Sequence, residues 1–191
     1  PTLALTLATA LAATALLATT EAAAGVKVVT TVPSLAALAR DVGGDRVELT
    51  ALVLPTQDAH FVDAKPSLVL RLNKADLEVG WLPALQTQAR NPRILSSGAG
   101  YLECAGHVRL RDLPSGPVDR SQGDVHPTGN PHYLFDPRAA ADGARAIAAG
   151  LARVDPRNAA TYRANLDRFL TRLDAARARW EKRLAPYRGA P

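Results

Sequence analysis

The chain of 191 residues contains four histidines and one cysteine, and the histidines are the residues best suited to hold a metal ion. His126 and His132 lie in one Pro- and Gly-rich stretch, and His60 lies in a polar segment that follows a strand-like run. Neutral imidazole is a common zinc ligand, and neighbouring prolines reduce the entropy that a loop loses on binding. The single cysteine, Cys104, excludes a cysteine-based zinc cluster within the chain. Loop histidines are more often exposed and idle than ligating, so spacing alone leaves both interpretations open.

The segments around these histidines alternate between strand-like and helix-like patterns. Helices are predicted to begin at Pro33 and Pro66, and a further helix over 82–89. Runs rich in β-branched and apolar residues predict strands over 26–31, 47–54, 77–80 and 94–95. This alternation predicts an α/β fold, a parallel sheet flanked by helices, in which ligands collect at the carboxyl ends of the strands. His60 follows the second strand and is expected at that edge.

The C-terminal third of the chain is predicted to be helical. Asp136-Pro137 is a start signal for a helix, and Asp155-Pro156 repeats that signal. No helix breaker follows until Pro186, and apolar residues recur at three- and four-residue spacing up to Leu184. The pattern predicts one long amphipathic helix of roughly 45 Å at 1.5 Å per residue. A helix of that length is suited to bridge two bodies.

The N-terminal segment resembles an export signal. Residues 1–20 carry no charge, and a small-residue triplet, Ala22-Ala23-Ala24, precedes Gly25. We interpret residues 1–24 as a secretory signal peptide whose start is missing, because the chain begins with Pro1 rather than Met. A transmembrane anchor is the competing interpretation, since the run is nearly long enough to span a bilayer. Export without a disulfide predicts a periplasmic location.

The bulk composition fits a globular domain, and its basic charge leaves a nucleic-acid-binding protein as a rival interpretation, against which the export signal argues. Hydrophobic residues make up 47% of the chain and charged residues 21%, which is enough for one hydrophobic core. The formal net charge of +5 comes mainly from arginines spread along helical stretches, without an aromatic platform for bases. We interpret this charge as solvated helix faces.

Five short motifs stand in the order and spacing of one family. They are Thr31-Val32-Pro33-Ser34, Gly44-Asp45-Arg46-Val47, Asp58-Ala59-His60-Phe61, Lys65-Pro66-Ser67, and Asn130-Pro131-His132-Tyr133 with Asp136-Pro137. With these motifs, the chain resembles the zinc/manganese-specific solute-binding proteins of metal ABC transporters, over residues 26–187. The Asp-x-His and Asn-Pro-His-Tyr motifs are the most specific of the five.

The resemblance implies two α/β lobes joined by a long rigid helix, with the metal ion held between the lobes. His60 and His132 match the first two histidine ligands of the family, and His126 resembles an auxiliary histidine found in one subgroup. His107 matches nothing in the family and is expected to be a surface residue. The third histidine and a carboxylate would come from the second lobe, so this chain would carry only part of the site.

The implied organisation divides the chain into four parts. Residues 1–24 would be the signal, 25–154 the N-terminal metal-binding lobe, 155–185 the interlobe helix, and 186–191 a stub of the missing second lobe. One departure concerns the strand near residues 76–81, which is shorter than the family pattern and puts the stability of the sheet in doubt. Another is Leu134-Phe135, which stands where the family often has tryptophan.

The function that the resemblance implies is transport rather than catalysis. We expect a monomeric periplasmic component that captures a divalent ion, zinc or else manganese, and delivers it to an ABC-transporter membrane permease. The alternative is a zinc-dependent hydrolase using His60, His126 and His132, with Asp58 or Asp124 as general base, although no His-Glu-x-x-His motif is present. A truncated gene product without a present role is a further alternative.

Overall fold

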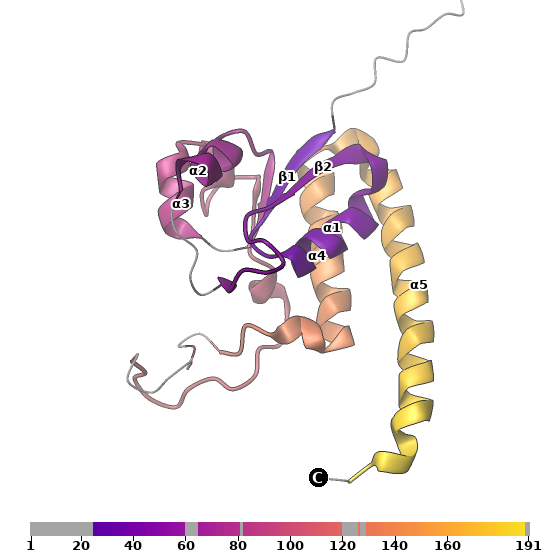
Figure 1. Cartoon of the computed structure of the whole chain (residues 1–191). Coiled ribbons are helices and arrows are strands. Elements are labelled where there is room, and N and C mark those ends of the chain that lie inside the picture. The colour runs from indigo at the N-terminus through magenta and orange to yellow at the C-terminus, as the bar shows by residue number, and fades with distance from the viewer. Residues whose placement is uncertain (1–24, 60–64, 81, 120–125, 127–128, 190–191) are drawn as a thin grey trace, which may run out of the picture.

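A parallel β-sheet of four strands forms the centre of the protein (Figure 1). The computed structural model describes residues 25–59, 65–80, 82–119, 126 and 129–189. The strands lie in the order β2-β1-β3-β4, and their bounds are β1 Val26–Thr30, β2 Val47–Ala51, β3 Leu77–Val79 and β4 Tyr101–Leu102. All three strand pairs are parallel, which confirms the predicted α/β class.

The inner strands β1 and β3 are the most buried, as expected where helices cover both faces of a parallel sheet. Side chains alternate along β1, so that Val28 and Val29 belong to two separate hydrophobic clusters. The short strand β3 pairs with β1 over three residues and with β4 over two. All three of its residues are buried, Glu78 included. Although β3 is short, it therefore still connects β1 to β4 within the sheet.

Two helices cover one face of the sheet with a third packed against them, and two shorter helices cover the other face (Figure 1). The larger side consists of α1 Pro33–Gly43, α4 Pro137–Val154 and α5 Ala159–Leu184. The smaller side consists of α2 Pro66–Asn73 and α3 Pro83–Ala89. Each of the helices α1 to α4 has proline at its start, where the missing N–H costs no intrahelical hydrogen bond. The predicted helix starts at Pro33 and Pro66 are confirmed.

The predicted fourth strand over residues 94–95 is wrong. Asn91 accepts a hydrogen bond from the backbone N–H of Arg93 and starts a 3₁₀ turn, Pro92–Ile94, instead. Ile94 is fully buried in this turn, so its apolar character reflects the core rather than a strand. The fourth strand follows later, where Tyr101 aligns with Glu78 of β3.

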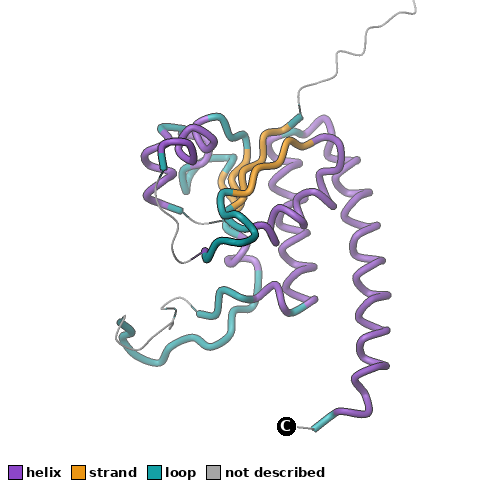
Figure 2. Tube along the Cα trace, viewed as in Figure 1, coloured by secondary structure: helices purple, strands orange, loops and turns teal. Residues whose placement is uncertain are grey.

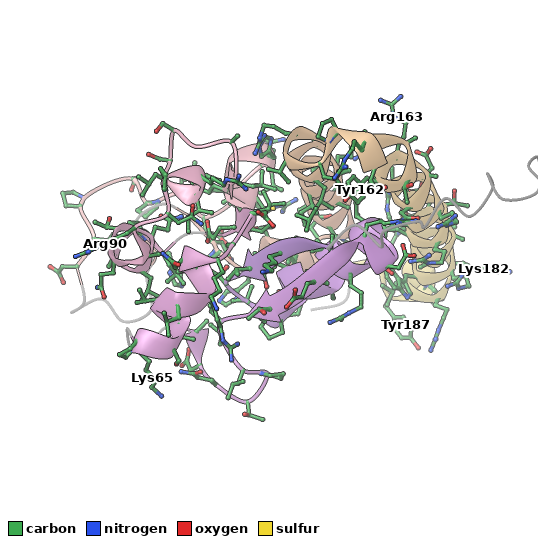
Figure 3. All side chains as sticks on the ribbon, turned by 90° about the horizontal axis from the view of Figure 1, so that it is seen from above. Lys65, Arg90, Tyr162, Arg163, Lys182 and Tyr187 are labelled. Carbon is green, nitrogen blue, oxygen red and sulfur yellow. The ribbon has the colours of Figure 1, made fainter. Side chains whose placement is uncertain are left out.

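The long helix α5 packs on the body only along its first half. Tyr162 is fully buried and its hydroxyl donates a 2.7 Å hydrogen bond to Asp155 Oδ2 at the junction with α4. Figure 3 shows Tyr162 near the neighbouring helix and Arg163 directed away from the body. Towards the far end, Trp180 is 46% exposed and Leu184 is 62% exposed. The helix therefore projects beyond the sheet, as Figure 1 shows.

The helices of the described residues include none that is both long and apolar enough to cross a membrane. The segment interpreted as a signal peptide, residues 1–24, lies outside the described residues.

Candidate metal centre

Loops gather at the carboxyl ends of the strands, and they bring two of the candidate ligands together (Figure 2). The imidazole rings of His126 and His132 have centroids 6.1 Å apart and stand nearly perpendicular, at 82°. The ring of His132 also lies against Phe135, with centroids 6.5 Å apart. Two of the three histidines predicted as ligands are therefore neighbours.

The position of His132 is set by the asparagine two residues before it. Asn130 Oδ1 accepts a 2.9 Å hydrogen bond from the backbone N–H of His132, a local bond that asparagine commonly makes in turns. Asn130 also binds the preceding loop, because its backbone N–H donates to Arg111 O at 2.9 Å and its Nδ2 donates to Asp112 Oδ2 at 3.0 Å. The Asn-Pro-His sequence thus fixes the histidine to a second loop. Asn130 belongs to the Asn-Pro-His-Tyr motif, but the motif by itself indicates no role for this residue.

A hollow of about 520 Å³ opens beside the two rings. It is lined by the ends of segments that follow β1 and β2 and by the loop that carries the histidines: Val32, Ser34, Leu35, Ala59, His126, Pro131, His132, Tyr133, Leu134 and Phe135. This is the edge of the sheet where parallel α/β folds bind ligands. Most of these side chains are apolar, so the imidazoles are the main candidate donors on the described wall.

His60 lies outside the described residues, but its neighbour Ala59 lines this hollow. Asp124, one proposed general base of the hydrolase alternative, also lies outside them. The other, Asp58, is described and is not among the residues that line the hollow. Over the described parts of the chain, no group of three or more histidine, cysteine or carboxylate side chains could hold a metal ion together.

The remaining histidine and the cysteine lie elsewhere. His107 ends a 3₁₀ turn, Cys104–His107, and is exposed away from the hollow. Cys104 is 1% exposed and belongs to the core between the sheet and α4. Burial, with a smaller effect from the charge of Glu78, raises the pKa of this thiol to about 12. Cys104 is therefore a neutral packing residue and not a thiolate ligand.

The sequence matches a known family as a whole rather than a single curated protein. Curated protein sequences give no significant match. Residues 28–190 match the family model described as "Zinc-uptake complex component A periplasmic".

Solved structures share the fold at low sequence identity. A zinc-bound deletion mutant of ZnuA is 23% identical with a TM-score of 0.67, and the match covers 85% of this chain and 59% of that one. The solute-binding protein FpvC from P. aeruginosa, in complex with Ni²⁺, is 22% identical with a TM-score of 0.62, covering 84% and 55%. The metal-dependent lipoprotein YcdH from Bacillus subtilis is 17% identical with a TM-score of 0.63, covering 82% and 55%.

The chain spans a little more than half the length of each of these structures. The family match extends over most of the chain and includes all five motifs on which the resemblance was based. That resemblance is confirmed: the chain belongs to the family of the periplasmic zinc-uptake complex component A.

Proposed function

We propose that this chain is the metal-binding part of a periplasmic solute-binding protein that captures a divalent ion, zinc in the first place, for a membrane permease of the ABC class. The observation that carries the proposal is the pair of imidazoles at the carboxyl edge of the sheet. His126 and His132 would be ligands, and His60 would be a third because Ala59 lines the same hollow.

The distance between the two rings suits a shared ion after a small adjustment. A Zn–N bond of about 2.0–2.1 Å places the centroid of a ligating ring roughly 3.2 Å from the ion. Two rings on one tetrahedral ion would then have centroids roughly 5.2 Å apart. The observed separation is 6.1 Å, about 1 Å more than this, so the spacing of the two rings suits a shared ion after a small movement of the loop.

Zinc is favoured because imidazole suits it, whereas manganese prefers carboxylate and other oxygen ligands. Solved structures with this fold hold zinc, nickel, manganese or iron(III), so the scaffold accommodates several ions. Two or three imidazoles would hold the ion weakly, and further ligands from elsewhere in a longer protein would complete the coordination. The ion is cargo in this scheme, and it binds and leaves unchanged.

We favour a carrier over a hydrolase for two reasons. First, the family to which the chain belongs is described by zinc uptake, which is transport and not hydrolysis. In addition, none of the described residues lining the hollow is a carboxylate, which a zinc hydrolase would use as general base.

A competition titration against a chromophoric zinc chelator tests this function. We expect saturable zinc binding that His132→Ala and His60→Ala each weaken by at least about tenfold, as loss of a ligand should. His107→Ala is the matched control, since His107 is exposed away from the hollow. A parallel titration with manganese should give weaker binding. Zinc affinity that is unchanged in both ligand variants would reject the proposed site.

A further inference from the structure

A second hollow, of about 450 Å³, lies behind the histidine hollow and shares a wall with it. The shared wall consists of His132, Tyr133 and Phe135. The far wall contains two arginines, Arg109 and Arg111, from the loop before the histidine segment. Neither the proposed metal ligands nor the fold explains why two cations line this hollow.

Arg109 and Arg111 lie in the segment 108–114, which has no helix or strand, and both of their side chains line the same hollow. The intervening Leu110 is partly buried towards Gly129, where an added Cβ would lie 3.3 Å from Leu110 Cβ. The 2.9 Å hydrogen bond from Asn130 N–H to Arg111 O then fixes this stretch beside His132.

The charge of this hollow is positive. Among the described residues, neither Arg109 nor Arg111 forms an ion pair or a side-chain hydrogen bond. The one carboxylate on the wall, Asp136, is already engaged, because both of its oxygens bind the guanidinium of Arg138 at 3.1 and 3.2 Å. Asp136 also caps α4 by accepting the backbone N–H of Arg138. The hydrogen bonds from Arg138 lower the pKa of this carboxyl, and Arg111 lies near enough to add to that effect. Neither Arg109 nor Arg111 is paired with it directly, so both guanidinium groups can bind a ligand.

We propose that Arg109 and Arg111 form an oxyanion site, which takes a carboxylate or phosphate group next to the histidine hollow. Guanidinium groups bind such anions through paired N–H donors in a fixed fork. The site itself stands on the two arginines; its role beside a metal ion rests on the proposed function. An unaccompanied divalent cation would be disfavoured by two nearby positive charges, whereas a cation that arrives with a carboxylate ligand would be favoured by them.

Two kinds of ligand could supply the carboxylate or phosphate group, and binding experiments can distinguish them. One source is a small oligocarboxylate that chelates the metal and occupies both hollows at once. The other is a free oxyanion that binds without regard to the metal. Citrate is the probe for the first source, and inorganic phosphate is the probe for the second.

Calorimetric titration of the metal-free chain at constant ionic strength tests the site without reference to zinc. We expect saturable binding of citrate that Arg109→Gln/Arg111→Gln weakens by at least about tenfold, as charge-assisted bidentate bonds are lost. The matched control is Arg163→Gln/Arg179→Gln, which removes two exposed arginines from α5. Unfolding midpoints of both variants establish that they fold alike.

A second series repeats the titration at saturating zinc. Stronger citrate binding with zinc, but unchanged phosphate binding, identifies a metal-chelating carboxylate; equal effects identify a free oxyanion. Failure to bind either anion saturably, or an equal loss in the control variant, overturns the proposal. The proposed zinc-binding function can be tested separately. At physiological salt, the zinc affinity of Arg109→Gln/Arg111→Gln should differ from that of the original chain by no more than about twofold for each charge removed.

Discussion

The imidazole of His126 stands edge-on to that of His132, with the ring planes at 82°. Five residues of Pro- and Gly-rich sequence separate them, and Asn130 Oδ1 holds the second histidine in place by accepting the backbone N–H of His132. Two of the three proposed metal ligands would thus come from one loop. This makes the contribution of each ring measurable.

The two rings should act as one unit towards zinc. We expect His126→Ala to weaken zinc binding less than His132→Ala, because the Asn130 contact preorganises His132. His126→Ala should reduce zinc affinity less in the His132→Ala background than in the original chain, because without His132 the two rings no longer share one ion. A double-mutant cycle by chelator competition measures this coupling. Strictly additive losses would show that the rings bind separate ions.

Glu78 should make the protein less stable as pH rises. Burial, partly offset by a 2.8 Å hydrogen bond from Gln86 and reinforced by the charge of Glu103, raises the pKa of Glu78 to about 7. Within the described residues, its Oε1 is buried and has no hydrogen-bond partner. The folded state therefore binds a proton that the unfolded state releases above its pKa of 4.5. Stability should fall between about pH 4.5 and 7 and stay lower above that, by roughly 3 kcal/mol in all.

The variant Glu78→Gln removes the ionisation but keeps the shape. We expect its urea-unfolding free energy to exceed that of the original chain at pH 8 and to converge with it near pH 4.5. Glu48→Gln, at an exposed position of β2, is the control and should follow the original pH profile. A pH profile of Glu78→Gln that also matches the original would refute the buried-acid explanation.

The Tyr162 hydroxyl should contribute to stability through its bond to Asp155. Burial alone would raise the pKa of Asp155, but hydrogen bonds from Asn158 and Tyr162 lower it below its ordinary value. Tyr162→Phe leaves the ring in the core but removes a bond to a charged acceptor, so we expect a loss of about 1.5–3 kcal/mol at pH 7. Because the carboxylate's stabilising contribution is lost as pH falls through its folded pKa, the loss should shrink in strong acid.

Denaturant unfolding followed by circular dichroism measures this difference. Tyr187→Phe is the control, since Tyr187 is 69% exposed, and it should change stability by less than about 0.5 kcal/mol. Equal effects of the two variants would contradict the role of the buried bond.

Gly80 should be intolerant of a side chain. It has φ of 144°, and a Cβ there would overlap the side chain of Thr31 beside the end of β3. We expect Gly80→Ala to lower the unfolding free energy by at least about 2 kcal/mol, through backbone strain and overpacking. Gly106→Ala is the matched control, because a Cβ at Gly106 meets nothing within 4 Å. A thermal unfolding midpoint of Gly80→Ala equal to that of the control would exclude this packing.

Local sequence patterns predicted much of the fold. Short local features were sufficient for four elements. Runs of β-branched residues predicted β1 and β2, and prolines predicted the starts of α1 and α2. The strand predicted at 94–95 was wrong because two adjacent apolar residues, of which only Ile94 is buried, look the same in a turn and in a strand. Only the pairing of Tyr101 with Glu78 distinguishes the two, and that pairing is not local.

The site was less accessible to sequence analysis. The pairing of His126 with His132 was suggested by the family resemblance and not by periodicity. The hydrogen bond from His132 N–H to Asn130 could have been predicted from the Asn-x-His spacing, because asparagine accepts the N–H two residues on. The hollow around Arg109 and Arg111 could not, because it depends on how two loops lie against each other.

The strand order β2-β1-β3-β4 places the first-made strand in the interior of the sheet. As the chain is synthesised, β1 must wait for β2 on one side and, much later, for β3 on the other, because no hairpin can close a parallel pair. Such non-local pairing makes folding slow and leaves Val26–Thr30 open to wrong partners in the meantime. We therefore expect the five residues of β1 to remain unpaired, and prone to misfolding, until β2 and β3 have been synthesised.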